Sequence, residues 1–215
     1  MFPDFLENPS DVAAPLLLGC TLTRTITLNG EKHKLVARIV ETEAYDQDDP
    51  ASHAFGGLSE RNAAMFGPAS HLYVYVSYGM HHCCNVVCGP DGFGSGCLVR
   101  AVEPLEGVGV MRELREAGRA GKAHTGRAGK EQAERARNHP LKLRDLTNGP
   151  GKVCAALGID KELYGHDLTV EPLVLDFAPL LPGEIIGSSP RVGISKNIDA
   201  PKRFFIEGNV FVSRA

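Results

Sequence analysis

Most of the structural signal in this chain lies in residues 37–85, ARIVETEAYDQDDPASHAFGGLSERNAAMFGPASHLYVYVSYGMHHCCN. The apolar, β-branched segment 35–40 predicts a buried strand. The strand continues into Glu41, Glu43 and Tyr45, which share one face at the two-residue period of a strand. Two neighbouring carboxylates at the end of a buried strand are candidates for a catalytic base, and the alternative is a solvated strand end.

The second half of this stretch predicts a β-hairpin. Residues 72–77 (LYVYVS) alternate aliphatic with aromatic or polar side chains, and after the break YGM the strand pattern resumes at 81–87. Tyr78 therefore falls at or near the tip. An aromatic side chain exposed at a hairpin tip is a candidate wedge for entry into another molecule.

The rest of the chain has the pattern of an α+β protein rich in hairpins. Asn29-Gly30 joins strand-like segments at 22–28 and 34–40, which is a strong hairpin signal. The sequence NGPGK opens a helix that ends at Gly158. Further strands are predicted at 97–102, 168–177, 191–194 and 204–213.

Length and composition indicate one domain over residues 1–215, because no linker-like break separates two apolar regions. No apolar run approaches the roughly 18 residues that span a bilayer, and the acidic N-terminus lacks the basic region of a secretory signal. We therefore expect a cytoplasmic protein without membrane contact. Its six cysteines are then most simply reduced core residues.

The formal net charge is −3, so any surface that binds nucleic acid must be local. Residues 112–144 contain ten Lys or Arg and four Asp or Glu, a local balance of +6. This asymmetry is the footprint expected of a protein that meets phosphates on one side. A solvated insertion without function is the alternative, since the composition of 118–130 suggests a flexible segment.

Three further features of the central strands bear on chemistry. The run His81-His82-Cys83-Cys84 suggests zinc, but adjacent strand residues point to opposite faces and no second spaced pair follows, so we expect no metal site. Asn85 carries both a donor and an acceptor, which suits a contact with a base edge. Arg100 lies in an apolar strand, where an arginine is costly unless it is paired.

Short motifs recur in one order along the chain. They are E-A-Y (43–45), A-S-H (51–53), R-N-x-x-M-F (61–66), L-Y-V-Y-x-x-Y-G-M (72–80) with a later Asn85, LVRAVEPLEG (98–107), NGPGKVCAALGI (148–159) and RVGISKN…KRFFIEGNVFVS (191–213). Together they resemble the alkyladenine (3-methyladenine) DNA glycosylase family. The resemblance covers nearly the whole chain outside 112–144.

This resemblance implies a single α+β domain in which a curved antiparallel sheet carries a protruding hairpin, with helices around it. It implies a monomeric enzyme of base excision repair that acts on double-stranded DNA, nucleoid-associated if bacterial. Such an enzyme flips alkylated purines out of the duplex and hydrolyses their N-glycosidic bond, without a lyase step, metal or cofactor. The expected bases are 3-methyladenine above all, then 7-methylguanine, ethenoadenine and hypoxanthine.

On the matching positions, the resemblance implies that Glu43 activates the attacking water and that Arg100 assists it. The flipped base is expected to stack between Tyr45 on one face and Tyr75 with His53 on the other. Asn85 is expected to exclude guanine, by a clash with its 2-amino group. Tyr78 is expected to intercalate where the base has left.

Two other functions fit parts of the sequence. A non-catalytic nucleic-acid-binding module of the formyltransferase C-terminal-domain type would keep the basic region but would need neither Glu43 nor a tyrosine-lined pocket. A carbohydrate glycosidase could use Glu41 with Glu43, but their spacing suits neither standard carboxylate separation, and the chain has no tryptophan for sugar stacking.

Overall fold

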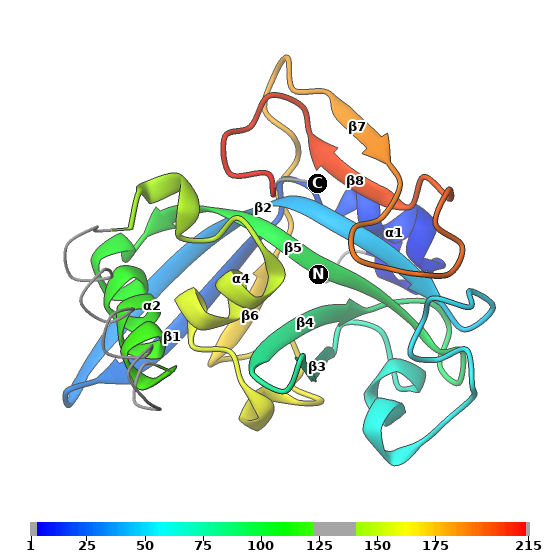
Figure 1. The fold of residues 1–215 in the computed structure, drawn as a ribbon, viewed down its shortest axis with the longest axis horizontal. Helices are drawn as coiled ribbons and strands as arrows, with labels where there is room; N and C mark the ends of the chain where they lie inside the picture. The colour runs from blue at the N-terminus through cyan, green and yellow to red at the C-terminus, as the bar shows by residue number, and fades with distance from the viewer. Residues whose placement is uncertain (1–3, 123–140, 214–215) are drawn as a thin grey trace.

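The computed structural model describes residues 4–122 and 141–213, and it forms one antiparallel sheet with helices around it (Figure 1). The sheet has eight strands in the order β3-β4-β5-β2-β1-β6, and β8 pairs with both β2 and β7. The strands are β1 (Thr21–Leu28), β2 (Glu31–Asp46), β3 (Leu72–Ser77), β4 (His81–Val87), β5 (Ser95–Glu106), β6 (Leu173–Asp176), β7 (Ile186–Ser189) and β8 (Arg203–Ile206). The α-helices are α1 (Ser10–Leu16), α2 (Val108–Lys122) and α4 (Pro150–Leu157). Figure 1 shows that the sheet is strongly curved, which confirms the expected fold class.

The long strand β2 is the centre of this sheet. It pairs with β1 through the predicted hairpin, where Asn29 and Gly30 both have positive φ, 53° and 85°. Two consecutive positive φ values are typical of the type I′ turn that the sequence Asn-Gly favours. On its other side, β2 pairs with β5 and β8, so it brings three distant segments together.

The two faces of β2 have different partners. The Thr42 hydroxyl donates a hydrogen bond of 2.8 Å to the carbonyl of Ala14 in α1. Glu41 and Glu43 lie on the opposite face, because successive strand side chains alternate. Both carboxylates contact the guanidinium of Arg100, which confirms the prediction that they share a face, and both are fully buried.

The helices cover the sheet around a continuous apolar core. Helix α1 packs against β2 and β5, while α4 packs against β4, β5 and α2. The core between them includes Leu22, Ile39, Val99 and Leu157, each with no exposed surface. Helix α4 ends where predicted, at Gly158, which is left-handed with φ of 58°.

The hairpin formed by β3 and β4 protrudes from this body, as the sequence predicts. Its tip is Tyr78-Gly79, with φ of 50° and 68°. Tyr78 is 85% exposed and Met80 is 61% exposed. A tyrosine at positive φ is uncommon and locally strained, which points to a function at the tip.

Three of the predicted late strands are wrong in whole or in part. Residues 191–194 form a loop, because Gly193 takes a φ of 76° and the chain leaves the extended conformation. The strand predicted at 168–177 is only Leu173–Asp176, since Asp167 starts a turn by accepting the Thr169 amide. The strand predicted at 204–213 ends at Ile206, before a turn at Gly208 with φ of 72°.

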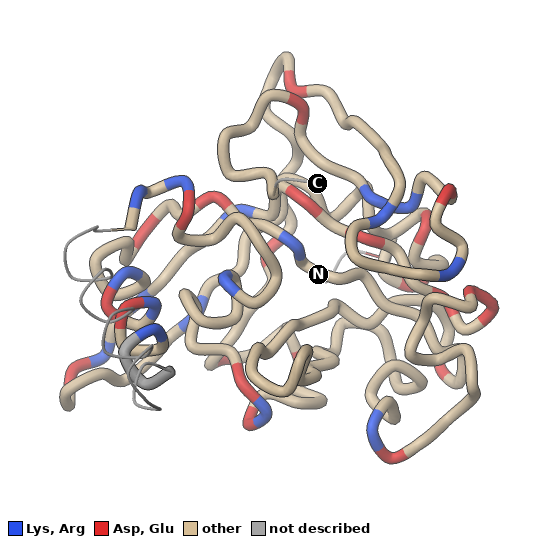
Figure 2. The backbone as a smooth tube through the Cα atoms, in the orientation of Figure 1, with Lys and Arg blue, Asp and Glu red and all other residues tan. Residues whose placement is uncertain are grey.

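The basic segment 112–144 is described only in part, because residues 123–140 lie outside the described residues. Lysines and arginines mark α2 and the chain that follows the gap (Figure 2). In α2, Arg112 donates a hydrogen bond to the carbonyl of Leu141, and Arg115 donates one of 3.0 Å to the carbonyl of Leu146. These two guanidinium groups therefore fasten α2 to the following chain. No helix among the described residues has the length and apolarity to cross a membrane.

We expect Gly158→Ala to lower the free energy of unfolding by roughly 1–2 kcal/mol, because an alanine resists the left-handed conformation. Its Cβ would also lie 2.7 Å from Cδ1 of Ile26. Gly118→Ala is the control: it lies within α2 with open space around it, so it should stabilise by up to about 1 kcal/mol. Urea unfolding measures both, and changes of the same sign would contradict this account.

Candidate active site

A pocket of about 620 Å³ opens between β2, the β3–β4 hairpin and the loop after β7. All seven residues singled out from the sequence border it, although they come from separate parts of the chain. They are Glu43, Tyr45, His53, Tyr75, Tyr78, Asn85 and Arg100. The structure therefore brings the predicted residues together, with a carboxylate in its buried wall and an aromatic side chain at its exposed rim.

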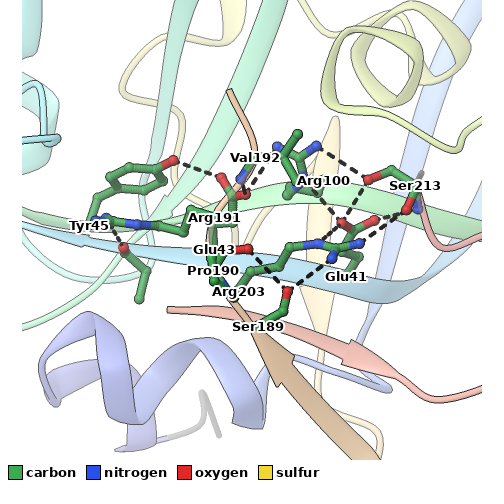
Figure 3. A network of polar contacts seen from close by, with 11 residues as sticks. Glu41, Glu43, Tyr45, Arg100, Ser189, Pro190, Arg191, Val192, Arg203 and Ser213 are labelled. Carbon is green, nitrogen blue, oxygen red and sulfur yellow. Dashed lines mark hydrogen bonds and ion pairs between the residues drawn. The ribbon is translucent and has the colours of Figure 1, made fainter. Parts of the chain in front are cut away.

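Glu43 is the buried carboxylate of this pocket, and three donors surround it (Figure 3). The Tyr45 hydroxyl donates to Oε2 at 2.7 Å, and the backbone amide of Val192 donates to Oε1 at 2.7 Å. A guanidinium nitrogen of Arg100 lies 3.2 Å from Oε1. These donors fix the position of the carboxylate in the pocket wall.

Glu41 forms a second, deeper network beside Glu43. Its Oε1 accepts from Nε of Arg100 at 3.1 Å and from Nε of Arg203 at 2.6 Å. Its Oε2 accepts the backbone amide of Ser213 at 2.6 Å, and the Ser213 hydroxyl donates to Oε1 at 2.7 Å. A buried carboxylate held by this many donors is a structural anchor, since its lone pairs are already occupied.

Arg100 joins the two carboxylates, because it contacts Glu41 through Nε and Glu43 through a terminal nitrogen. Burial alone would lower the pKa of Arg100, but the charges of Glu43 and Glu41 raise it above its ordinary value. The guanidinium thus stays charged and offsets the repulsion between the two acids. This pairing explains how an arginine is accommodated in an apolar strand.

Aromatic rings form the opposite wall of the pocket. The rings of His53 and Tyr75 meet edge to face with centroids 4.6 Å apart, and Tyr75 stacks on Tyr73 at 5.6 Å. Nδ1 of His53 lies 3.0 Å from the Tyr73 hydroxyl. Burial raises the pKa of Tyr45 and Tyr75 above their ordinary value and that of Tyr73 to about 12, so these hydroxyls remain protonated at neutral pH.

His53 is exposed towards solvent, yet the protein around it still removes water from the imidazole. This desolvation, followed by the charge of Arg61, lowers the pKa of His53. The ring is therefore mainly neutral at neutral pH. A neutral imidazole adds an aromatic face to the pocket without adding a positive charge.

Strand alternation along β4 separates pocket residues from core residues. Cys83 and Asn85 border the pocket, whereas Cys84 lies in the apolar core. The Asn85 amide donates a long hydrogen bond of 3.4 Å to the Tyr73 carbonyl. All six cysteines are free and buried, and the described residues contain no group of three or more His, Cys, Asp or Glu able to hold a metal ion.

Several pocket residues were not singled out from the sequence. Tyr73 and Cys83 could have been found, because they share the hairpin face of Tyr75 and Asn85. Val192 could not, since its contribution is a backbone amide that any residue other than proline provides. Arg191, beside it, lies with its guanidinium carbon 4.6 Å from the centre of the Tyr45 ring.

The sequence of residues 4–210 matches the family model of the methylpurine-DNA glycosylases. The chain belongs to this family. Among curated relatives, the "Putative 3-methyladenine DNA glycosylase" of Nitrosospira multiformis is 44% identical over 211 residues, which cover 98% of this chain and 92% of the relative. Proteins with the same name from Agrobacterium fabrum (46% identical, 82% of this chain, 77% of the relative) and Carboxydothermus hydrogenoformans (39%, 94% and 93%) also match.

Membership of the methylpurine-DNA glycosylase family confirms the enzyme class expected from the sequence, a DNA N-glycosylase of DNA repair. The carbohydrate glycosidase and the non-catalytic binding module lose their support, because the match extends over almost the whole chain. The roles of the individual pocket residues remain predictions.

At the hairpin tip, we expect Tyr78→Asn to separate stability from DNA binding. Asparagine tolerates positive φ better than tyrosine, so the variant should be more stable by up to about 1 kcal/mol. Affinity for duplex DNA carrying a modified purine should fall about tenfold or more, because the ring that we expect to intercalate is lost. Tyr78→Phe, which keeps the ring, is the control, and unchanged affinity in Tyr78→Asn would refute the wedge.

Proposed function

We propose that this protein removes alkylated purines from double-stranded DNA, 3-methyladenine above all, by hydrolysis of the N-glycosidic bond without a lyase step. The observation that carries the proposal is the composition of the pocket. It combines a buried carboxylate held by three donors, a wall of protonated tyrosines and an exposed tyrosine at one rim. Each of these is required by a different step of base excision.

The first step is exposure of the base. A purine inside a duplex is out of reach, so the nucleotide must flip out at a cost of a few kcal/mol. Tyr78 is largely exposed at the hairpin tip beside the pocket, and it would enter the stack from the minor groove to fill the vacancy. The pocket volume of about 620 Å³ is ample for one base and its sugar.

The second step is recognition of the base. The flipped purine would stack between Tyr45 and the pair formed by His53 and Tyr75. A purine that carries an extra alkyl group and a positive charge binds aromatic faces more strongly than an unmodified one. Asn85 would act against guanine, by a clash with the 2-amino group. Accordingly 7-methylguanine, ethenoadenine and hypoxanthine are secondary candidates.

The third step is hydrolysis. A carboxylate has about four lone-pair sites, and Glu43 already uses three on Tyr45, Val192 and Arg100. The remaining site can bind a water, orient it towards C1′ of the sugar and accept its proton. The same negative charge would stabilise the oxocarbenium-like sugar as the base departs. Alkylation makes the purine a good leaving group, so this step requires no cofactor.

A lyase step would need an amine that attacks C1′. Lys196 borders the pocket, but it is solvent-exposed, and an exposed ammonium is a poor nucleophile. We therefore propose a monofunctional enzyme. We further propose that it acts as a monomer, since every group in the mechanism belongs to one chain, and that it works in the cell compartment that holds the DNA.

We expect Glu43→Gln to slow base release from 3-methyladenine duplexes by about 10²- to 10⁴-fold, because the amide cannot accept the proton of water. Binding of the same duplex should persist. Single-turnover release, with ethenoadenine and hypoxanthine duplexes in parallel, measures the rate and the breadth of substrates.

Glu41→Gln is the matched comparison for this test. It removes a buried charge from two arginines, so it should lower the free energy of unfolding by about 3 kcal/mol and affect the chemical step less. Equal loss of rate in both variants would contradict the assignment of Glu43 as the base. Failure of the unmodified protein to release any of these bases would refute the proposed substrates.

We expect borohydride reduction during turnover to trap no covalent adduct between the protein and DNA, because a monofunctional enzyme forms no Schiff base. Lys196→Gln should release the modified base at a rate close to that of the unmodified protein. An adduct that forms with the unmodified protein and is lost in Lys196→Gln would show that a lyase step exists.

A further inference from the structure

We propose that Arg191 and Asp49 form a charge pair behind Tyr45 that determines how strongly the pocket prefers cationic over neutral purines. The inference rests on the proposed function, in which the flipped base stacks on the open face of Tyr45. Neither residue is among those that border the pocket. They would act on the base through the ring and are therefore positioning residues.

Arg191 lies directly against the tyrosine ring. Its guanidinium carbon is 4.6 Å from the ring centre, within the range of a cation–π contact (Figure 3). The Arg191 side chain has no exposed surface, while Tyr45 borders the pocket, so the guanidinium covers the ring face that is turned away from the base. Nε and one terminal nitrogen of Arg191 lack hydrogen-bond partners among the described residues, which leaves the ring face as their partner.

Asp49 fixes and neutralises this arginine. Its Oδ2 lies 2.7 Å from a terminal nitrogen of Arg191, which also donates to the Ala44 carbonyl at 2.9 Å. Burial alone would raise the pKa of Asp49, but its ion pair with Arg191 and the hydrogen bond from the Ala51 amide help to bring it below its ordinary value. The carboxylate therefore remains charged across the neutral range.

One more pair of charges completes the cluster behind the ring. Lys202 lies 3.7 Å from a carboxylate oxygen of Asp49 and 3.8 Å from one of Asp46. Two cations thus face two carboxylates, and the cluster is balanced. Removal of a single charge would leave a net charge of one sign behind Tyr45.

A ring that holds a cation on one face binds a second cation on the other face less well, since both draw on the same π electrons and repel each other. Because Asp49 balances the charge of Arg191, this repulsion is suppressed. The pocket therefore keeps its affinity for cationic bases. The affinity for a neutral base depends little on the charge behind the ring. The ratio of the affinities for a cationic and a neutral base of the same shape therefore isolates the effect.

The experiment measures this ratio in the Glu43→Gln background, where the base stays attached. The probes are duplexes that carry 3-methyladenine or its neutral 3-deaza analogue. Asp49→Asn leaves Arg191 uncompensated and should lower the cationic-to-neutral ratio by about three- to tenfold. Arg191→Met leaves an uncompensated carboxylate and should raise the ratio by a similar factor.

Two further variants control for packing. Arg191→Lys keeps the charge, and the double variant Asp49→Asn with Arg191→Met keeps the balance, so both should stay close to the parent ratio. Partial unfolding changes both affinities of one variant equally and cancels in the ratio. Shifts of opposite sign in the two single variants support the inference.

Two results would overturn the inference about Arg191 and Asp49. The first leaves the proposed function intact, and the second refutes it as well. If the single variants weaken both duplexes by the same factor, Arg191 only packs against Tyr45, and the proposed function stands. If the parent binds neither modified duplex better than undamaged DNA, the proposed function itself fails, and this inference with it.

Discussion

The site depends on one interaction, the placement of the Arg100 guanidinium between the carboxylates of Glu41 and Glu43. Two acids side by side in a buried strand would otherwise repel each other without water to screen them. The arginine reaches them only because β5 pairs with β2 in the observed register, with its bulges around Glu41. The register of the sheet therefore also determines the electrostatics of the pocket, because it places Arg100 beside both acids.

This constraint divides the acids by role. Glu41 is saturated by donors from β5, β8 and the chain near Ser213, so it holds the scaffold in place. Glu43 borders the pocket, and the proposed mechanism assigns its fourth acceptor position to the attacking water. Rigid walls around a fixed carboxylate suit a reaction that needs an accurately placed water, since loss of position costs rate steeply. The proposed entry into DNA falls instead to Tyr78, at the exposed tip of the β3–β4 hairpin.

Sequence patterns predicted the parts of this design that are local. The two-residue period of β2 places Glu41 and Glu43 on one face, and Asn29-Gly30 fixes the first hairpin. The network around Glu41 could not be predicted, because its partners are far away along the chain. The strand predicted at 191–194 is a loop. Its apolar residues match the pattern of a strand, but that pattern gives no information on the positive φ of Gly193. Backbone donors such as the Val192 amide carry no residue-specific signal.

The contact between Glu41 and Ser213 spans 172 residues of sequence. Such a contact raises the contact order of the domain, and loop closure over that length must precede any gain from the bond. During synthesis Glu41 leaves the ribosome long before two of its partners, Arg203 and Ser213, whereas Arg100 follows much sooner. The nascent protein therefore holds Glu41 with only part of its network until residues 203–213 have emerged, so this network is completed late in folding.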